Sequence, residues 1–365
     1  MRWTWKRGGA NKHLVISWSG RTLAYVLACG DAVKGYTVLG SGVKRDCAND
    51  FRQLVEDLKA FNLEGLEVKV MLRPGQYQLL EIKAPAVAPD ELRAAVRFKI
   101  RDMLDFPIDE VTLDLMRAGD GQQEGPAQLF AVAARNVVIR DVLDLCHAMR
   151  WTVSVIDIHE MAQRNLQTAL IARHGGVNQA HAALFWIDQL HTVLTISANG
   201  ELFYTRRFDF LQGLSEAVPD SGMKAAAQVI SPAAKSSVSM NFGRDHQESH
   251  FFPASRSRVN TPYISTPMPA GGAWNDNPSQ RFLAELKRSF DFWERTWPGM
   301  PLASMNLNAG TSSRRLAEWL GPELEQEVQP MDIGWLFPDF EVPAPDEALC
   351  LPLLGVLLRT ENRTL

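Results

Sequence analysis

Two copies of a strand–turn–strand pattern, one in each half of the chain, constrain the fold more than any other feature of this sequence. Residues 14–18 and 22–29 are strand-like segments on either side of a short turn. In the second half, residues 192–196 and 202–210 flank Asn199-Gly200, a dipeptide that strongly favours a two-residue hairpin turn. A chain in which each half carries the same hairpin is expected to contain two related structural units.

Helical and strand-like segments alternate between and after the two hairpins, which is typical of an α/β protein. Apolar residues recur every three or four positions in the predicted helices. Asp90 is expected to cap the helix that starts beside it. The predicted helices cover residues 50–61, 90–103, 137–149, 159–173, 280–297, 312–320 and 348–358, and the further strands cover residues 35–39, 68–72, 77–84, 111–115, 129–134, 153–157, 182–186 and 304–307.

Residues 214–280 interrupt this alternation. They contain 11 Ser and 7 of the 20 Pro, with no sustained apolar periodicity. Such a segment buries too little apolar surface to offset the entropy of ordering it, so we expect a long flexible insertion. A linker between domains is the alternative. The hairpin before the segment and the helix after it favour the insertion, because both resemble parts of one domain.

The charge balance and the cysteines narrow the classes of function. The chain has 38 Lys+Arg against 42 Asp+Glu, a net charge of −4, whereas a dedicated nucleic-acid binder is usually clearly basic. Its four cysteines form no CxxC pair, which favours reduced thiols. The longest apolar run, residues 348–358, is shorter than the roughly 20 residues of a membrane span. We therefore expect a soluble, cytoplasmic protein that binds no nucleic acid.

Two sets of sequence segments resemble known proteins. The first set is residues 90–96, 106–114, 130–135 and 155–162, and it resembles the PilM proteins of type IV pilus assembly. The second set is residues 76–81, 288–298 and 357–359, and it resembles in particular the PilM-like proteins of mannose-sensitive haemagglutinin (MSHA) pili. The resemblance covers most of the chain except residues 1–11 and 214–280, and it rests on the order and spacing of the motifs.

This resemblance implies an actin-like, two-lobed fold of the type found in PilM and FtsA. The first lobe would span residues 12–180 and would include an extra small subdomain at about 71–130. The second lobe would span residues 181–360 and would carry the flexible insertion 214–280. The two hairpin-led halves agree with this expectation, although they do not by themselves identify the fold.

The resemblance also implies a partner. PilM proteins hold the cytoplasmic tail of a PilN-like bitopic inner-membrane protein in a groove beside the extra subdomain, so this chain would be a scaffold that reaches the membrane only indirectly. Arg97 and Phe98 lie off the apolar stripe of their helix, and Phe106-Pro107 follows it. We expect these four residues at the surface as partner-binding residues. The alternatives are a solvated face for Arg97 and packing on a neighbouring strand for Phe98.

A nucleotide site of the actin-like kind is expected to be degenerate. The first hairpin of such ATPases carries an Asp and a Gly, but the matching positions are Ser17 and Ser19, with Gly20 one residue late. In the second hairpin Asp188 lies two residues beyond the expected position, and Gly310 is the one glycine left in the third motif. A serine cannot supply the negative charge that magnesium prefers. We therefore expect no catalytic residue, no metal and no cofactor. If the chain does bind a nucleotide, ATP is the one expected.

Two other functions remain open. An actin-like enzyme, either an ATPase or a small-molecule kinase, would show tight magnesium-dependent ATP binding. A cytoplasmic domain resembling the general-secretion GspL proteins would share the fold. The second alternative is disfavoured because GspL carries its own membrane span and no such span is expected here.

Overall fold

The computed structural model describes residues 12–20, 22–31, 34–45, 65–121, 127–174, 179–187, 191–209 and 278–359. Three predictions lie outside these residues. They are the helix at 50–61, nearly all of the insertion 214–280, and the position of Asp188.

The first lobe is built on a five-stranded sheet with the order β3-β2-β1-β4-β8. Its first three strands are antiparallel, whereas β4 and β8 run parallel to β1. The predicted hairpin is confirmed: β1 and β2 pair from Lys12↔Cys29 to Ser19↔Thr22. The strands are β1 (Lys12–Ser19), β2 (Thr22–Asp31), β3 (Gly35–Lys44), β4 (Glu67–Leu72) and β8 (Thr152–Ile158).

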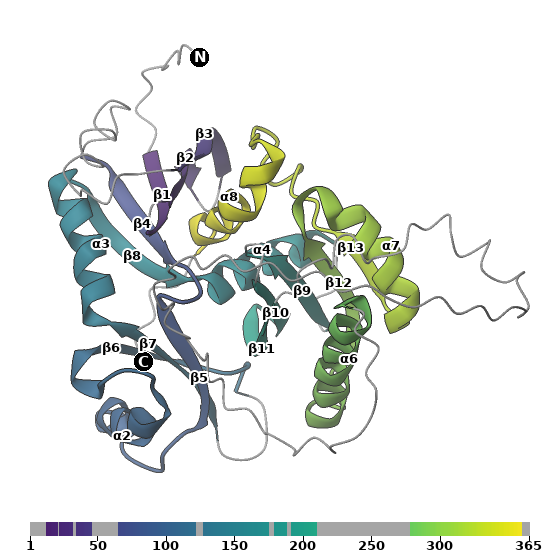
Figure 1. The fold of residues 1–365 in the computed structure, drawn as a ribbon, viewed down its shortest axis with the longest axis horizontal. Helices are drawn as coiled ribbons and strands as arrows, with labels where there is room; N and C mark the ends of the chain where they lie inside the picture. The colour runs from purple at the N-terminus through teal and green to yellow at the C-terminus, as the bar shows by residue number, and fades with distance from the viewer. Residues whose placement is uncertain are drawn as a thin grey trace, which may run out of the picture.

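The second lobe repeats this topology. Its sheet has the order β11-β10-β9-β12-β13, again with three antiparallel strands followed by two parallel ones. Asn199 and Gly200 have φ values of 53° and 78°, the left-handed pair that the predicted hairpin turn requires. The duplicated sheets give the two-lobed α/β, actin-like fold (Figure 1). The strands are β9 (Ala180–Trp186), β10 (His191–Ala198), β11 (Glu201–Asp209), β12 (Leu302–Asn308) and β13 (Glu327–Pro330).

A third, three-stranded sheet of order β5-β7-β6 extends from the first lobe. Helix α2 (Leu92–Ile100) packs on one of its faces, at the lower left of Figure 1. The expected cap at Asp90 is wrong. The backbone N–H of Leu92 bonds the carbonyl of Pro89 in a turn, and the helix starts later with no side-chain cap. The strands are β5 (Tyr77–Lys83), β6 (Val111–Arg117) and β7 (Gln128–Arg135), and the short helices beside them are η1 (Arg101–Met103) and η2 (Ile108–Glu110).

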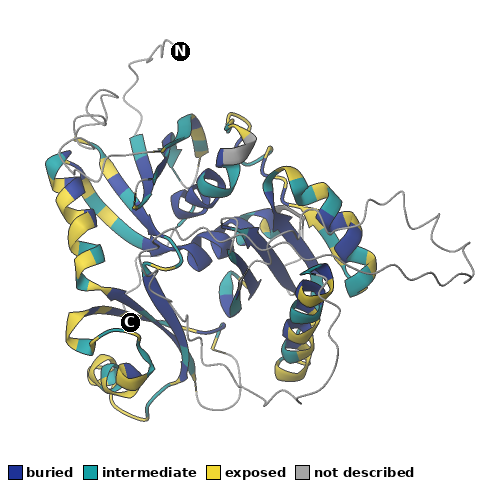
Figure 2. Ribbon diagram, viewed as in Figure 1, coloured by how far each residue is buried: buried dark blue, intermediate teal, exposed yellow. Residues whose placement is uncertain are grey.

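Two helices fill the space between the large sheets, and the others cover the outside. Helix α8 (Ala344–Leu357) contacts β1 to β4, and α4 (His159–His174) contacts β9 to β11 as well as α8. In Figure 2 the described residues of both helices are coloured mostly as buried. On the outside, α6 (Pro278–Thr296) turns its aromatic stripe into the second core, where Trp293 is fully buried, as the sequence predicted. The remaining helices are α3 (Asn136–Ala148), η3 (Gly310–Ser312) and α7 (Ser313–Leu324). No helix in the described part of the chain is long and apolar enough to cross a membrane.

Candidate functional site

Ser17, which the sequence comparison set against the acidic residue of actin-like ATPases, is fully buried and accepts hydrogen bonds from a guanidinium group. Arg73 follows β4 and donates from Nε to Ser17 Oγ at 2.9 Å and from Nη2 to the Ser17 carbonyl at 3.1 Å. A neutral hydroxyl next to a fixed cation is a poor environment for magnesium, which prefers anionic oxygen ligands. Both oxygen atoms of Ser17 are therefore already engaged by this cation.

The other expected phosphate-loop positions that the structure describes lie at two places, the end of β1 with the turn after it and the start of η3. Ser19 is half-buried at the end of β1, and Gly20 is exposed with φ +56° in the turn. Gly310 begins η3, where its N–H bonds Asn308 Oδ1 at 3.2 Å and its carbonyl accepts from Ser313 Oγ at 2.8 Å. Both backbone groups of Gly310 are thus engaged within the turn. Within the described ranges, no group of three or more His, Cys, Asp or Glu side chains is placed to hold a metal.

A buried set of ionisable side chains joins the small subdomain to both lobes. This Glu160 cluster consists of Tyr77 from β5, His159 and Glu160 from α4, and Arg207 from β11. The Tyr77 hydroxyl donates a hydrogen bond to Glu160 Oε2. Arg207 donates two hydrogen bonds to Glu160 Oε1, from Nε at 2.9 Å and from Nη2 at 2.8 Å. The guanidinium also lies over the Tyr77 ring, 4.6 Å from its centre. Three elements from different parts of the chain are fixed by one carboxylate.

The charges of this cluster follow from burial and pairing. Burial alone would raise the pKa of Glu160, but Arg207 and the Tyr77 hydroxyl hold it below the ordinary value. Burial lowers the pKa of His159 to about 4, with the charge of Glu160 opposing the shift. At neutral pH Glu160 is therefore ionised and His159 is neutral. The sequence analysis did not identify this cluster. The available sign was that α4 begins with His159 and Glu160 and has few apolar positions.

The four predicted partner-binding residues have different environments. Phe98 is 74% exposed on α2, as predicted, and the guanidinium carbon of Arg101 lies 5.2 Å from its ring centre. Arg97 is half-buried and donates to the carbonyls of Val111, at 3.1 Å, and Ile108. The expectation that Arg97 is freely available at the surface is therefore wrong, because it ties α2 to the strand beneath. Phe106 is half-buried against the apolar cluster between α2 and the subdomain sheet, and Pro107 is exposed.

The two faces of the subdomain sheet have different neighbours. Leu80 and Leu113 lie on the face that α2 covers, whereas Leu79 and Phe130 belong to the core of the first lobe. Phe98 thus belongs to the helix on the side turned away from that core. Glu81 shares the Leu79 face by strand alternation, and burial raises the pKa of its carboxyl. The two faces of the subdomain sheet therefore lie in different environments.

Residues 76–214 match the family model of the type IV pilus assembly protein PilM. Over almost its whole length, the chain is also similar in structure to a "PilM-PilN type IV pilus biogenesis complex". The identity is 18%, the match covers 95% of this chain and 98% of that one, and the TM-score is 0.62. The chain thus resembles PilM in part of its sequence and in its fold.

Two further solved structures resemble this PilM-like chain at lower similarity. The cytoplasmic domain of EpsL of Vibrio cholerae matches at 13% identity over 58% of this chain and 76% of its own, with a TM-score of 0.40. A Bacteroides thetaiotaomicron protein with an actin-like ATPase fold matches at 8% identity over 95% and 96%, with a TM-score of 0.45. A search of curated proteins finds no significant match.

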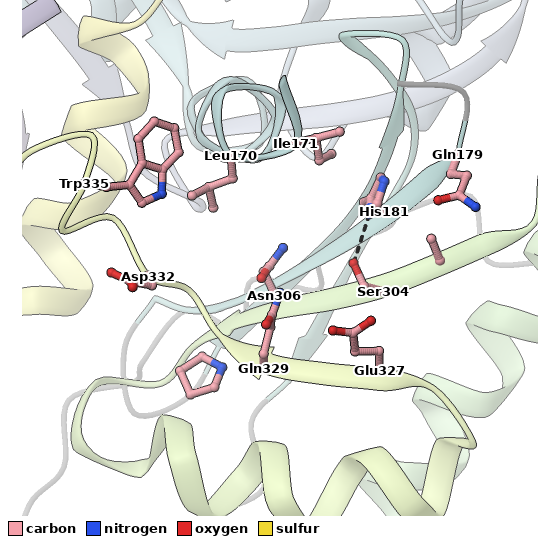
Figure 3. A pocket seen from close by; sticks show the side chains of 12 residues that line it. Leu170, Ile171, Gln179, His181, Ser304, Asn306, Glu327, Gln329, Asp332 and Trp335 are labelled. Atoms are coloured by element: carbon pink, nitrogen blue, oxygen red, sulfur yellow. Dashed lines mark hydrogen bonds between the residues drawn. The ribbon is translucent and has the colours of Figure 1, made fainter. Parts of the chain in front are cut away.

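The PilM-like chain also has a polar pocket that lies away from the hairpins. It has a volume of about 410 Å³ and lies between the end of α4 and strands β9, β12 and β13 (Figure 3). His181 and Ser304 are hydrogen-bonded on its floor through Nδ1 and Oγ at 2.9 Å. The sequence did not predict this pocket, because its residues come from four separate segments and carry no motif.

Proposed function

We propose that this protein is a scaffold of a type IV pilus assembly platform and binds the cytoplasmic tail of a PilN-like bitopic inner-membrane protein. The observation that carries the proposal is the PilM family match over residues 76–214, which run from β5 to just beyond β11 and include the subdomain and the Glu160 cluster. The likeness in fold to PilM supports it. The protein would be cytoplasmic and would reach the inner membrane through this partner.

The finer proposal is that the protein is MshI, the PilM-like protein of the MSHA pilus. It rests on the resemblance of residues 76–81, 288–298 and 357–359 to that branch. Two of these segments lie in structurally important places, since 76–81 forms most of β5 and 357–359 ends α8. Co-purification with the inner-membrane partner of an MSHA system, but not with that of another type IV pilus system, is the expected result.

We further propose that the protein hydrolyses no ATP and that its nucleotide site is degenerate. Support comes from Ser17, whose hydroxyl and carbonyl both accept hydrogen bonds from Arg73. Phosphate release at saturating ATP and magnesium is expected to stay at the background rate. Turnover that is abolished by Asp188→Asn would contradict this, because it would assign Asp188 a catalytic role.

The partner tail is proposed to bind beside α2, where Phe98 is the large exposed apolar side chain and Pro107 ends the exposed turn. Burial of such a side chain in an interface supplies much of the binding energy at small peptide sites. Arg97 supports this surface from below rather than touching the tail, because its guanidinium is bonded to two carbonyls of the subdomain.

Calorimetry with a synthetic tail of the PilN-like protein tests the proposal. Phe98→Ala is expected to weaken binding by about 1–2 kcal/mol, roughly 5–30-fold, without lowering the melting temperature. Leu143→Ala on α3 is the matched control, because Leu143 is an exposed apolar residue on another helix of the first lobe. It is expected to leave the affinity unchanged.

A second variant separates the two surfaces of the subdomain. If Glu81→Gln weakens binding and Phe98→Ala does not, the tail binds on the side that faces the lobes and the assignment of Phe98 is wrong. If the unmodified protein binds no tail at all, the scaffold proposal itself fails. Arg97→Glu does not serve as a binding probe, since it is expected to lower the melting temperature by breaking the α2 contacts.

A further inference from the structure

The pocket beside α4 has a floor made by polar residues from three adjacent strands. His181, Ser304 and Glu327 are aligned by the register of β9, β12 and β13, and Asn306 and Gln329 form the next row. Side chains in register on neighbouring strands point to the same face of a sheet. The polar character is therefore built into three strands at once.

The part of this floor that β9 and β12 supply is buried and internally hydrogen-bonded, whereas Glu327 and Gln329 on β13 are exposed. His181 and Ser304 are each 8% exposed and Asn306 is 6% exposed. Asn306 Nδ2 donates to Gln167 Oε1 at 3.3 Å, in addition to the bond between His181 and Ser304. Polar groups that are buried under a helix cost free energy unless they are satisfied, and side chains that fix one another form a preorganised site. The volume of about 410 Å³ is within the usual range for a small-molecule site.

The charges around the opening are of one sign. Glu327 and Asp332 are exposed carboxylates, and the described residues that line the pocket include no Lys or Arg. Figure 3 shows Asp332 and Trp335 on one side and Glu327 on the other, with Asn306 and Gln329 between them. Two separated carboxylates favour a ligand that has a positive charge at each end. The face of the Trp335 ring can contact one of these two cationic groups. Phosphorylated compounds are disfavoured by the same charges.

We propose that this pocket binds a small aliphatic dication that carries an amine or a guanidinium group at each end. One cationic group would pair with Glu327, and the other would lie between Asp332 and the indole of Trp335. Leu170 and Ile171 would contact the aliphatic part of the ligand. This inference does not depend on the proposed scaffold function, because no part of it uses the subdomain or the partner tail.

Calorimetry with putrescine and agmatine tests the proposal on the intact protein. Both are expected to bind saturably and to bind about fivefold or more tightly than butylamine, which has a single charge. The neutral isostere 1,4-butanediol and inorganic phosphate are expected not to bind. Glu327→Gln and Asp332→Asn are each expected to reduce the affinity for putrescine to that of butylamine. Asn at 332 keeps the oxygen that accepts from the Gly334 N–H.

Asp339→Asn is the matched control, since it removes one exposed carboxylate of the same lobe that does not line the pocket. It is expected to leave binding unchanged. In the unmodified protein, the Trp335 indole N–H resonance, assigned through Trp335→Phe, is expected to shift with putrescine. Failure of both dications to bind at about 10 mM would overturn the proposal. So would equal losses in the control and the pocket variants, or binding that leaves the Trp335 resonance unmoved.

Discussion

The two helices between the lobes cover equivalent sheets, yet one interface is apolar and the other is polar. Helix α8 has only Asp346 and Glu347 as charged residues, and its apolar side chains share a core with the first sheet. In α4, nine of the sixteen residues are polar or charged, although most of its described side chains are buried. The two sheets have the same topology, but the helix interface on one is apolar and the helix interface on the other is polar.

The polar interface carries hydrogen-bonding groups that its own side chains do not satisfy. Within the described ranges, Thr195 Oγ1, Ser197 Oγ and Gln167 Nε2 have no hydrogen-bond partner. Thr195 and Ser197 lie on β10 opposite Ala183 and His181, on the face that α4 covers. Each unsatisfied buried group costs free energy. The lesson is that topology fixes where α4 lies but not how firmly it is held, which depends on a few specific contacts.

The largest expected effect comes from the Glu160 cluster, the strongest of those contacts. Glu160→Gln removes the anion and leaves the Arg207 charge buried, so the free energy of unfolding in urea is expected to fall by about 3–5 kcal/mol. Asp114→Asn removes the carboxylate of an exposed ion pair with Arg93 and is expected to cost less than about 1 kcal/mol. Equal losses would mean that α4 is held mainly by packing.

A methyl group placed where the two helices meet is expected to have the next largest effect. A Cβ on Gly355 of α8 would lie 1.9 Å from the carbonyl oxygen of Ala162 in α4. Gly355→Ala is expected to lower the free energy of unfolding by about 3 kcal/mol through this overlap, although alanine is the better helix former. Gly299→Ala, where a Cβ meets nothing within 4 Å, is the control. A stabilised Gly355→Ala protein would show that the helices separate easily.

Acid is expected to weaken the α4 interface in particular. His159 has a pKa of about 4 in the folded protein and about 6.5 when unfolded, so only the unfolded state gains a proton between these values. The neutral His159 side chain therefore stabilises the fold fully at pH values above 6.5, and this stabilisation is lost as the pH falls. The loss amounts to about 2 kcal/mol at pH 5. His159→Phe is expected to remove that part of the pH dependence in urea titrations. An unchanged slope would exclude His159 as its source.

A pair of threonines on facing strands gives the smallest expected effect and the sharpest test of the comparison. Thr195 and Thr205 are register partners on β10 and β11, and Thr205 Oγ1 donates to the Leu194 carbonyl at 3.1 Å. Thr195→Val is expected to stabilise the protein by about 1 kcal/mol, whereas Thr205→Val is expected to destabilise it by about the same amount. A destabilised Thr195→Val protein would show that this hydroxyl is satisfied in solution.

Local sequence patterns predicted the elements well and the site poorly. The Asn199-Gly200 turn and the Trp293 stripe were predictable, because each depends on residues close together in sequence. Arg97 was predicted to be free at the surface, but it donates hydrogen bonds to the carbonyls of Ile108 and Val111. The helical pattern around Arg97 does not encode these contacts, because both carbonyls belong to a later part of the chain. The Glu160 cluster joins residues that are 83 and 47 positions apart, and no periodicity encodes such a meeting. The pocket was unpredictable for the same reason.

The hydrogen bonds between Arg73 and Ser17 have a consequence for any attempt to build a metal site in this hairpin. An aspartate introduced at position 17 would meet a guanidinium already in place and would form a buried ion pair with it, leaving little negative charge for a metal ion. Arg73→Ala alone would remove both hydrogen bonds to Ser17. Neither single substitution would therefore create a carboxylate at position 17 that is free to bind a metal ion, and both residues would have to change together.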